Sequence, residues 1–144
     1  MAKAFKFELQ DVLDFRNFEK EEAQNELAKA LAVEAQIKDN LQIIASQFIS
    51  VKNQIDASSS FEDIAAGNSR KKFLEMQKEE LLQQLAQAEL VSEQKRAALA
   101  EAMKKTTALE KLKEKQLEGW KEEANREEEA FIDDLASSGK HYHQ

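Results

Sequence analysis

Apolar residues recur along the chain in alternating steps of four and three, the heptad spacing that is typical of coiled-coil helices. In the first part of the chain the seam positions are Leu9, Leu13, Ala23, Leu27, Ala30, Ile37, Leu41, Ile44, Phe48, Val51 and Ile55. The pattern resumes with Leu74, Leu81, Leu85, Ala88, Leu99, Ala102, Leu109 and Trp120. The spacing predicts two long helices, over about residues 6–57 and about residues 70–136.

The break between the two patterns lies at residues 58–69, where three consecutive serines and the first glycine occur. Ser59 and Glu62 have the spacing of a capping box, and Gly67 suits the position just after a helix end. We therefore predict a chain reversal that contains one short helix. The last residues, about 137–144, are expected to form a frayed tail.

The predicted fold class is all-α: a single domain, residues 1–144, folded as a long two-helix antiparallel coiled-coil hairpin with a short helical turn segment. The two seams match in phase if facing residues have numbers that sum to about 129, as those of Glu34 and Lys95 do. In that register two polar seam positions form one ion pair. A shift by one heptad preserves the phase as well, so the choice between these registers stays open.

Composition agrees with long helices and argues against an enzyme. Ala, Glu, Lys, Leu and Arg supply 78 of the 144 residues, and there is no proline or cysteine. These features exclude a sheet-rich fold, a disulfide framework and thiolate chemistry. The chain has no Gly-rich phosphate loop, and its two histidines, His141 and His143, fall in the predicted tail. We expect no catalytic residues, no cofactor and no metal site.

Charge and hydropathy narrow the range of partners. The formal net charge is −7, which argues against binding to duplex nucleic acid. No apolar run approaches the roughly 20 residues that cross a bilayer, and the first residues lack the apolar core of a secretory signal. We expect a cytoplasmic protein that does not insert into the membrane.

Bulky apolar residues, most of them off the seam, gather at both ends of the predicted hairpin. At the end that holds the termini they include Phe5, Phe7, Val12, Phe15, Phe18, Leu112, Leu117 and Trp120. Near the turn they are Ile43, Ile49, Phe61, Ile64, Phe73 and Met76. Each group either packs on itself as a thickened core or docks a partner, and the sequence leaves both readings open.

Three segments carry a family resemblance: FKFELQDVLDFRNFEKEEAQNELAKAL at the start, KKFLEMQKEEL after the turn, and LEKLKEKQLEGWKEEANREEEAFIDDLA near the end. The last segment is the most specific, because its LEKLK is followed by Trp120, by Arg126 with Glu127, and by Ile132 with Asp133. Taken in order, the segments resemble the flagellar export protein FliJ family, over nearly the whole chain.

The resemblance implies a soluble, non-enzymatic stalk component of the flagellar type III export apparatus. Such a protein binds and stimulates the hexameric export ATPase. It also contacts the export-gate membrane protein and export chaperones, at the inner-membrane face of the flagellar base. It would take part in flagellum biogenesis and motility as an ATPase regulator and chaperone escort.

The resemblance also implies site residues. Those that would face the ATPase are Phe5, Phe7, Leu9, Val12, Arg16, Leu112, Lys113, Trp120, Arg126, Ile132 and Asp133. Ile44 and Phe73 would face the export gate, whereas Gln47 and Val51 stand where some members have aromatic residues. Two alternatives remain: a general export chaperone or holdase that binds several clients, and a structural scaffold in which the chain dimerises in parallel.

Overall fold

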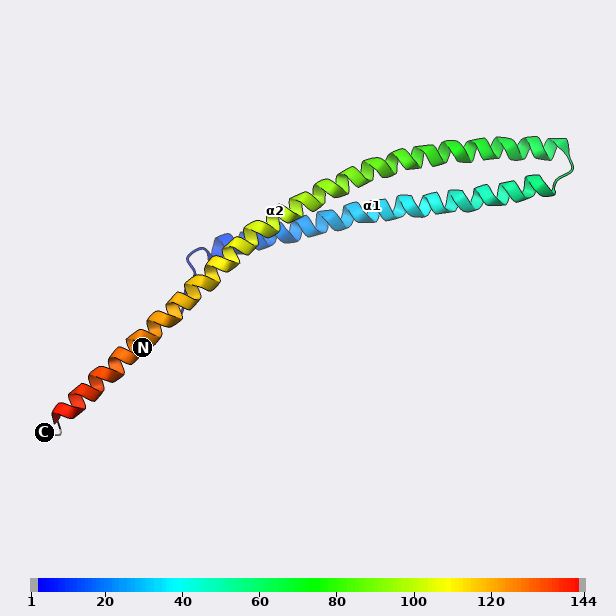
Figure 1. The fold of residues 1–144 in the computed structure, drawn as a ribbon. Coiled ribbons are helices and arrows are strands. Elements are labelled where there is room, and N and C mark those ends of the chain that lie inside the picture. Colours follow the sequence, from blue (N-terminus) through cyan, green and yellow to red (C-terminus); the bar gives the residue numbers. More distant parts are fainter. Residues whose placement is uncertain (1–2, 143–144) are drawn as a thin grey trace. The chain divides into compact units, whose positions relative to one another are not determined.

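The structure is a computed structural model that describes residues 3–142, with side chains described as far as Gly139. Helix α1 spans Gln10–Ala57 and helix α2 spans Phe61–Tyr142, with 48 and 82 residues, and no strand occurs among the described residues. The helices run in opposite directions from the connection at residues 58–60 (Figure 1). The predicted all-α helical hairpin is therefore confirmed.

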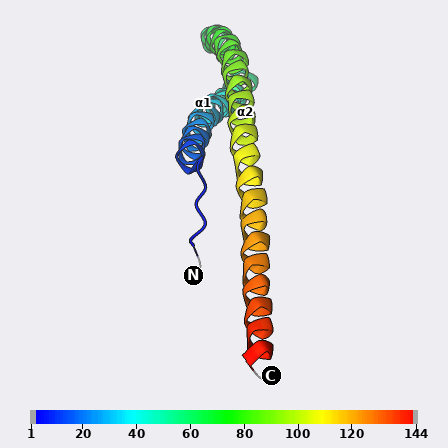
Figure 2. The same ribbon diagram turned by 90° about the vertical axis from the view of Figure 1, so that its left-hand side faces the viewer.

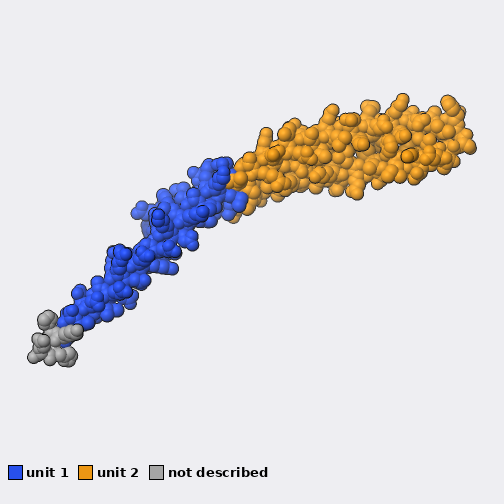
Figure 3. All heavy atoms as spheres, in the orientation of Figure 1, with its two compact units in different colours: residues 1–20, 101–144 blue, residues 21–100 orange. Residues whose placement is uncertain are grey.

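The chain divides into two compact units, and each contains a part of both helices (Figure 3). Unit 1 combines residues 1–20 with residues 101–144, and unit 2 consists of residues 21–100. Unit 2 contains the turn between the helices, and unit 1 contains both ends of the chain.

In unit 1, α1 begins four residues later than the predicted start at about residue 6. The Leu9 carbonyl is the first to accept a helical bond, from the Leu13 amide at 2.9 Å, and the Gln10 amide donates to the Phe7 carbonyl at 3.1 Å. The segment before α1 is extended and runs along α2 (Figure 2). Alternate side chains of an extended segment point to the same side, so Phe5 and Phe7 can both turn away from solvent there.

In unit 2, the predicted separate helix within the turn is wrong, because α2 begins at Phe61 and continues without a break. The Ser60 carbonyl accepts the first helical bond from the Ile64 amide at 3.1 Å, so Ser60 is the N-cap residue. Glu62 and Asp63 follow in the first turn, where negative charge favours the positive end of the helix dipole. A serine cap followed by two acids is enough to start α2 directly after a three-residue connection.

Gly67 lies inside α2 and does not end a helix, since no described glycine has a positive φ. Its lack of a side chain serves close packing instead. A Cβ atom at this position would lie 2.5 Å from Cγ1 of Ile55, which is too close for two carbon atoms. The glycine signal in the sequence is thus explained by the approach of α1 to α2 beside the turn.

The register of the helices is one heptad tighter than the predicted sum of 129. In unit 2 the numbers of the contacting residues Ile55 and Gly67 sum to 122. In unit 1 those of Arg16 and Thr106 also sum to 122. The predicted turn was centred near residue 64, whereas the actual turn is centred at Ser59. Because 122 and 129 differ by seven residues, the observed register also keeps the seams in phase.

The predicted Glu34–Lys95 pair is therefore not formed. Glu34 accepts a hydrogen bond from the Ser92 hydroxyl, and Lys95 lies 3.6 Å from the carboxylate of Glu26. Both charged side chains have partners on the opposite helix. The partner of Glu34 lies about one helical turn from the predicted position, and the partner of Lys95 lies about two turns from it.

The seam of unit 2 combines small and large residues. Ala30, Ala88 and Ser92 are all buried, and small side chains at a helix contact allow a close approach. Nearer the turn the buried residues are larger and include Val51 and Leu74. No buried side-chain nitrogen or oxygen in the described part of the chain lacks a hydrogen-bond partner.

At its far end α2 is helical as far as Tyr142, beyond the predicted end at about residue 136. The predicted frayed tail at 137–144 is thus helical over most of its length. The last two residues of that tail lie outside the described part of the chain.

Candidate functional site

The residues that the resemblance selects as partner contacts divide cleanly between the two units. Every predicted ATPase-facing residue belongs to unit 1, from the N-terminal segment, the start of α1 and the second half of α2. The predicted gate-facing residues Ile44 and Phe73 both belong to unit 2.

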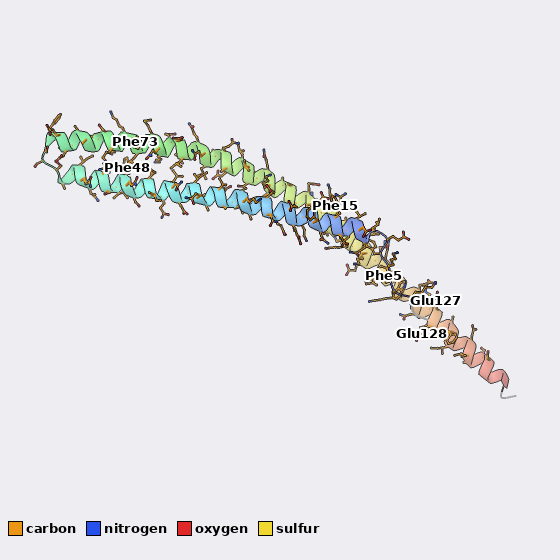
Figure 4. The ribbon with its side chains drawn as sticks, turned by 180° about the vertical axis from the view of Figure 1, so that it is seen from behind. Phe5, Phe15, Phe48, Phe73, Glu127 and Glu128 are labelled. Carbon is orange, nitrogen blue, oxygen red and sulfur yellow. The ribbon has the colours of Figure 1, made fainter. Side chains whose placement is uncertain are left out.

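Three aromatic residues of the ATPase-facing set pack within unit 1. The rings of Phe5 and Trp120 are 6.1 Å apart between centroids and tilted by 57°, a favourable aromatic geometry. Phe7 is only 5% exposed. Figure 4 shows Phe5 on the segment that lies against α2. For these residues the packed-core reading holds, and they hold the N-terminal segment on α2.

A second group in unit 1 is exposed. Val12 is 41% exposed, and Phe15 and Phe18, at successive steps of three along α1, are 56% and 58% exposed. Residues three apart are neighbours on a helix surface, so this α1 strip (Val12, Phe15 and Phe18) is one continuous apolar surface. Leu9 and Leu112 are exposed to a similar extent as Val12. The resemblance did not select Phe15 and Phe18; the available signal was their position off the heptad seam.

The two cations of the set in the paired part of unit 1 have intramolecular partners. The Arg16 guanidinium forms an ion pair with Glu19 at 2.7 Å, and it lies 6.0 Å from the centre of the Phe15 ring. Lys113 donates a hydrogen bond from Nζ to Oε1 of Gln10 across the two helices, at 2.7 Å. Each of these two cations therefore has a partner within unit 1, and Arg16 lies beside the Phe15 ring of the α1 strip.

The last part of α2 has no packing partner within the described residues. Every residue from 125 to 138 is exposed. The apolar side chains Phe131, Ile132 and Leu135 are 64%, 55% and 57% exposed and form one patch at helical spacing, which we call the α2 end patch. A helical segment that packs against no other part of the described chain and exposes an apolar patch is typical of a surface that a partner covers.

Acidic residues surround the α2 end patch. Residues 121–134 contain seven acids and two bases, and Glu127 and Glu128 lie on the part of α2 beyond Phe5 (Figure 4). The predicted contact residue Arg126 is 4.0 Å from Glu123 with its side chain 74% exposed, and Asp133 is exposed as well. The surface is suited to a partner that combines apolar and basic groups.

In unit 2, the predicted gate-facing residues line two adjoining grooves. Ile44 lines a groove with Asn40, Ile43, Gln47, Gln77, Glu80, Leu81 and Gln84. Phe73 lines a second groove with Gln47, Ser50, Arg70, Leu74 and Gln77. Because Gln47 and Gln77 belong to both grooves, Ile44 and Phe73 face the same side of unit 2. Phe73 is 57% exposed, whereas Val51 is 1% exposed and belongs to the seam.

Among the described residues there is no group of three His, Asp or Glu side chains that could hold a metal ion. No described helix is long and apolar enough to span a membrane. The side chains of His141 and His143 lie outside the described part of the chain.

Comparison with protein families identifies a relationship over most of the chain. The family described as "Flagellar FliJ protein" matches residues 5–141, nearly the whole chain. No curated protein and no solved structure matches the chain significantly.

Proposed function

The chain belongs to the family of flagellar FliJ proteins, and so is a protein of flagellar type III export; on this premise we propose that it is a non-enzymatic stalk that binds and stimulates the hexameric export ATPase through unit 1. The same protein links the ATPase to the export gate through unit 2 and hands over export chaperones. It works in the cytoplasm, at the inner-membrane face of the flagellar base.

The observation that carries the ATPase contact is the unpartnered last part of α2. Its apolar patch of Phe131, Ile132 and Leu135 is more than half exposed, and acidic residues flank it. The exposed α1 strip belongs to the same unit. Large exposed apolar patches ringed by charge are typical of protein interfaces.

A physical mechanism for stimulation follows from the dimensions of a paired coil. Two α-helices side by side, each about 10–12 Å in diameter, form a rod roughly 20 Å across. Such a rod is asymmetric, so inside a ring of six equivalent subunits it contacts different subunits differently. A ligand that binds two conformations unequally shifts their populations, and the stalk stimulates ATP turnover in this way.

The gate contact is supported by the geometry of unit 2. Phe73 is exposed, and Ile44 lies in the adjoining groove on the same side. An apolar side chain beside grooves lined by glutamine gives a partner both a hydrophobic anchor and hydrogen-bond donors and acceptors. Replacement of Phe73 by alanine should weaken gate binding without an effect on the ATPase.

The test of the ATPase contact uses two matched isoleucines. Ile132, in unit 1, is 55% exposed, and Ile49, in unit 2, is 59% exposed, and both lie on helices. We expect Ile132→Ala to weaken binding to the purified export ATPase and its stimulation, by a factor of about 5 to 30 for a loss of 1–2 kcal/mol. Ile49→Ala should leave both unchanged.

Circular dichroism and the thermal unfolding midpoint should be the same for both variants, since neither side chain is buried. The proposal fails if the unaltered protein changes neither the oligomer size nor the ATP turnover of the ATPase. Equal effects of the two substitutions would also contradict the assignment of the contact to unit 1.

One observation favours a second function, a holdase that binds several export clients. Exposed apolar side chains continue along unit 2, among them Val33, Leu82 and Leu90. A holdase would bind unfolded export subunits in the absence of the ATPase. Its affinity would fall with Leu82→Ala and Leu90→Ala, which lie outside the proposed ATPase surface.

A further inference from the structure

We propose that the hairpin has a second register, one heptad away from the register described, in which Glu34 pairs directly with Lys95. In the described register facing residues have numbers that sum to about 122, as with Ile55 and Gly67. In the second register the sum is about 129. The change moves α2 by seven residues along α1, or about 10 Å at 1.5 Å per residue.

The seams accept both registers because a shift of one heptad returns seam positions to seam positions. In the described register Glu26 and Lys95 pair across the two helices. One helical turn further along, the same register places Leu99 opposite Ala23. In the second register Leu99 faces Ala30 instead. Leu81 changes its partner from Leu41 to Phe48 in the same way. Apolar residues thus meet apolar residues in both arrangements.

The charged seam positions of unit 2 have partners in both registers. In the described register Lys95 reaches Glu26 at 3.6 Å, and Glu34 accepts a hydrogen bond from the Ser92 hydroxyl. The second register places the carboxylate of Glu34 opposite the ammonium of Lys95, so these two charges pair with each other instead.

The beginning of α2 can supply the longer turn that the second register needs. Phe61 is 84% exposed, and of residues 61–66 only Ile64 is partly buried, so this stretch loses few contacts when it leaves the helix. Gly67 in a helix interior is unfavourable by about 1 kcal/mol relative to alanine, and it is well suited to end a turn. Asn68 and Ser69 can then cap a helix that begins later.

Contacts in unit 1 hold the described register. Gln10 accepts a hydrogen bond from Lys113, and the Thr106 hydroxyl lies 3.2 Å from the Arg16 carbonyl. The second register separates both pairs and places Arg16 opposite Lys113, two like charges. An acidic group of a partner between these cations would offset their repulsion and favour the second register. This coupling to a partner rests on the proposed function, whereas the existence of the second register does not.

The test uses disulfide formation in the full-length chain, which has no cysteine of its own. All three variants share Leu99→Cys. The pair Ala23→Cys with Leu99→Cys reports the described register, and Ala30→Cys with Leu99→Cys reports the second register. Ala28 is exposed on α1, so Ala28→Cys with Leu99→Cys measures chance approach.

For a minor state that lies a few kcal/mol higher, we expect the 30–99 pair to form at about 0.1–10% of the rate of the 23–99 pair. This rate should exceed that of the 28–99 pair. Glu34→Lys, which opposes two ammonium groups in the second register but faces the neutral Ser92 hydroxyl in the described one, should reduce the 30–99 rate to the control value. The exchange Glu34→Lys with Lys95→Glu should restore it.

A 30–99 rate no higher than that of the 28–99 pair overturns the second register, and so does a 30–99 rate that Glu34→Lys leaves unchanged. Helicity measured by circular dichroism shows that each variant is folded, and gel mobility distinguishes links within one chain from links between chains. Addition of the export ATPase tests the coupling separately. A higher 30–99 rate on addition supports the coupling, and no change refutes the coupling alone.

Discussion

Two hydroxyl side chains in the helix seams show how a narrow coil tolerates polar groups. Thr106 is 1% exposed and Ser92 is 3% exposed. Each hydroxyl lies within hydrogen-bond distance of a carbonyl four residues earlier in α2 and of a group on α1. A hydroxyl has a single proton, so it serves one of these acceptors at a time. Each hydroxyl can therefore donate its proton to a carbonyl of its own helix, whichever group α1 places opposite it.

This argument predicts different effects for two substitutions of Thr106. Thr106→Val keeps the shape of the side chain and leaves no buried donor unpaired, so the free energy of unfolding should change by less than about 0.5 kcal/mol. Thr106→Ala leaves a small cavity at a fully buried site and should lower that free energy by about 1 kcal/mol. Urea unfolding measures both. A large destabilisation by valine would mean that the hydroxyl bond to the Arg16 carbonyl matters in itself.

The glycines of α2 offer a second prediction at this scale. A Cβ atom at Gly119 would meet nothing within 4 Å, so Gly119→Ala should raise the free energy of unfolding by about 0.5–1 kcal/mol through helix propensity. At Gly67 the same gain is opposed by the contact with Ile55, and displacement of a packed side chain costs about 1–3 kcal/mol. We expect Gly67→Ala to be destabilising.

Thermal and urea unfolding of the two alanine variants, side by side, check this prediction. Gly67→Ala combined with Ile55→Val, which removes one methyl group near the clash, should recover part of the lost stability. Equal stabilisation by both glycine replacements would show that α1 does not approach Gly67 closely.

Sequence alone identified the candidate site residues by type, but it did not separate packed from exposed ones. Phe7 and Phe15 both lie off the regular seam, yet Phe7 is 5% exposed and Phe15 is 56% exposed. The difference arises because the chain before Gln10 is extended, and this changes the direction of the Phe7 side chain. The prediction of a helix from about residue 6 onward could not show that Phe7 is buried and Phe15 is exposed.

At the scale of elements, the sequence predicted both helices, because a heptad of apolar residues without proline has few other solutions. It failed at the turn, because Gly67 was read as a helix end. The glycine is in fact required by the approach of Ile55 to the interior of α2. That one misreading moved the turn by several residues and the register by one heptad. The register of a hairpin depends on loop length, which the periodicity of the helices does not determine.

The part of α2 beyond its partner gives a prediction for a whole segment. Deletion of residues 125–144 should leave the thermal unfolding midpoint unchanged, because every residue from 125 to 138 is exposed. The helical signal should fall in proportion to the residues removed. Deletion of residues 2–8 should instead destabilise unit 1 by about 2 kcal/mol, since it removes the buried Phe7 ring and the Phe5 contact with Trp120.

Circular dichroism melts of the two deletions provide the comparison. A drop of several degrees on removal of residues 125–144 would show that the segment packs on something in solution, such as a second copy of the chain. Binding to the export ATPase should be lost with the same deletion, because it removes the α2 end patch.

At the scale of the whole molecule, the two candidate surfaces belong to different compact units, and this gives the proposed linker role a sharp consequence. If unit 1 binds the ATPase and unit 2 binds the gate, each contact can be removed without the other. Val12→Ala, in the exposed α1 strip, should weaken ATPase binding and spare the gate, and Phe73→Ala should do the reverse. Both side chains are exposed, so neither change should alter the unfolding midpoint.

The decisive measurement is a bridging experiment with the purified cytoplasmic part of the gate protein on a bead and the export ATPase in solution. The unaltered protein should bring the ATPase to the bead, and each single variant should reduce the amount retained by about tenfold for a loss near 1.4 kcal/mol. A mixture of the two variants should retain no more than either one alone, because neither chain has both intact surfaces. Recovery of the bridge by the mixture would mean that two copies cooperate and that the link is not made within one chain.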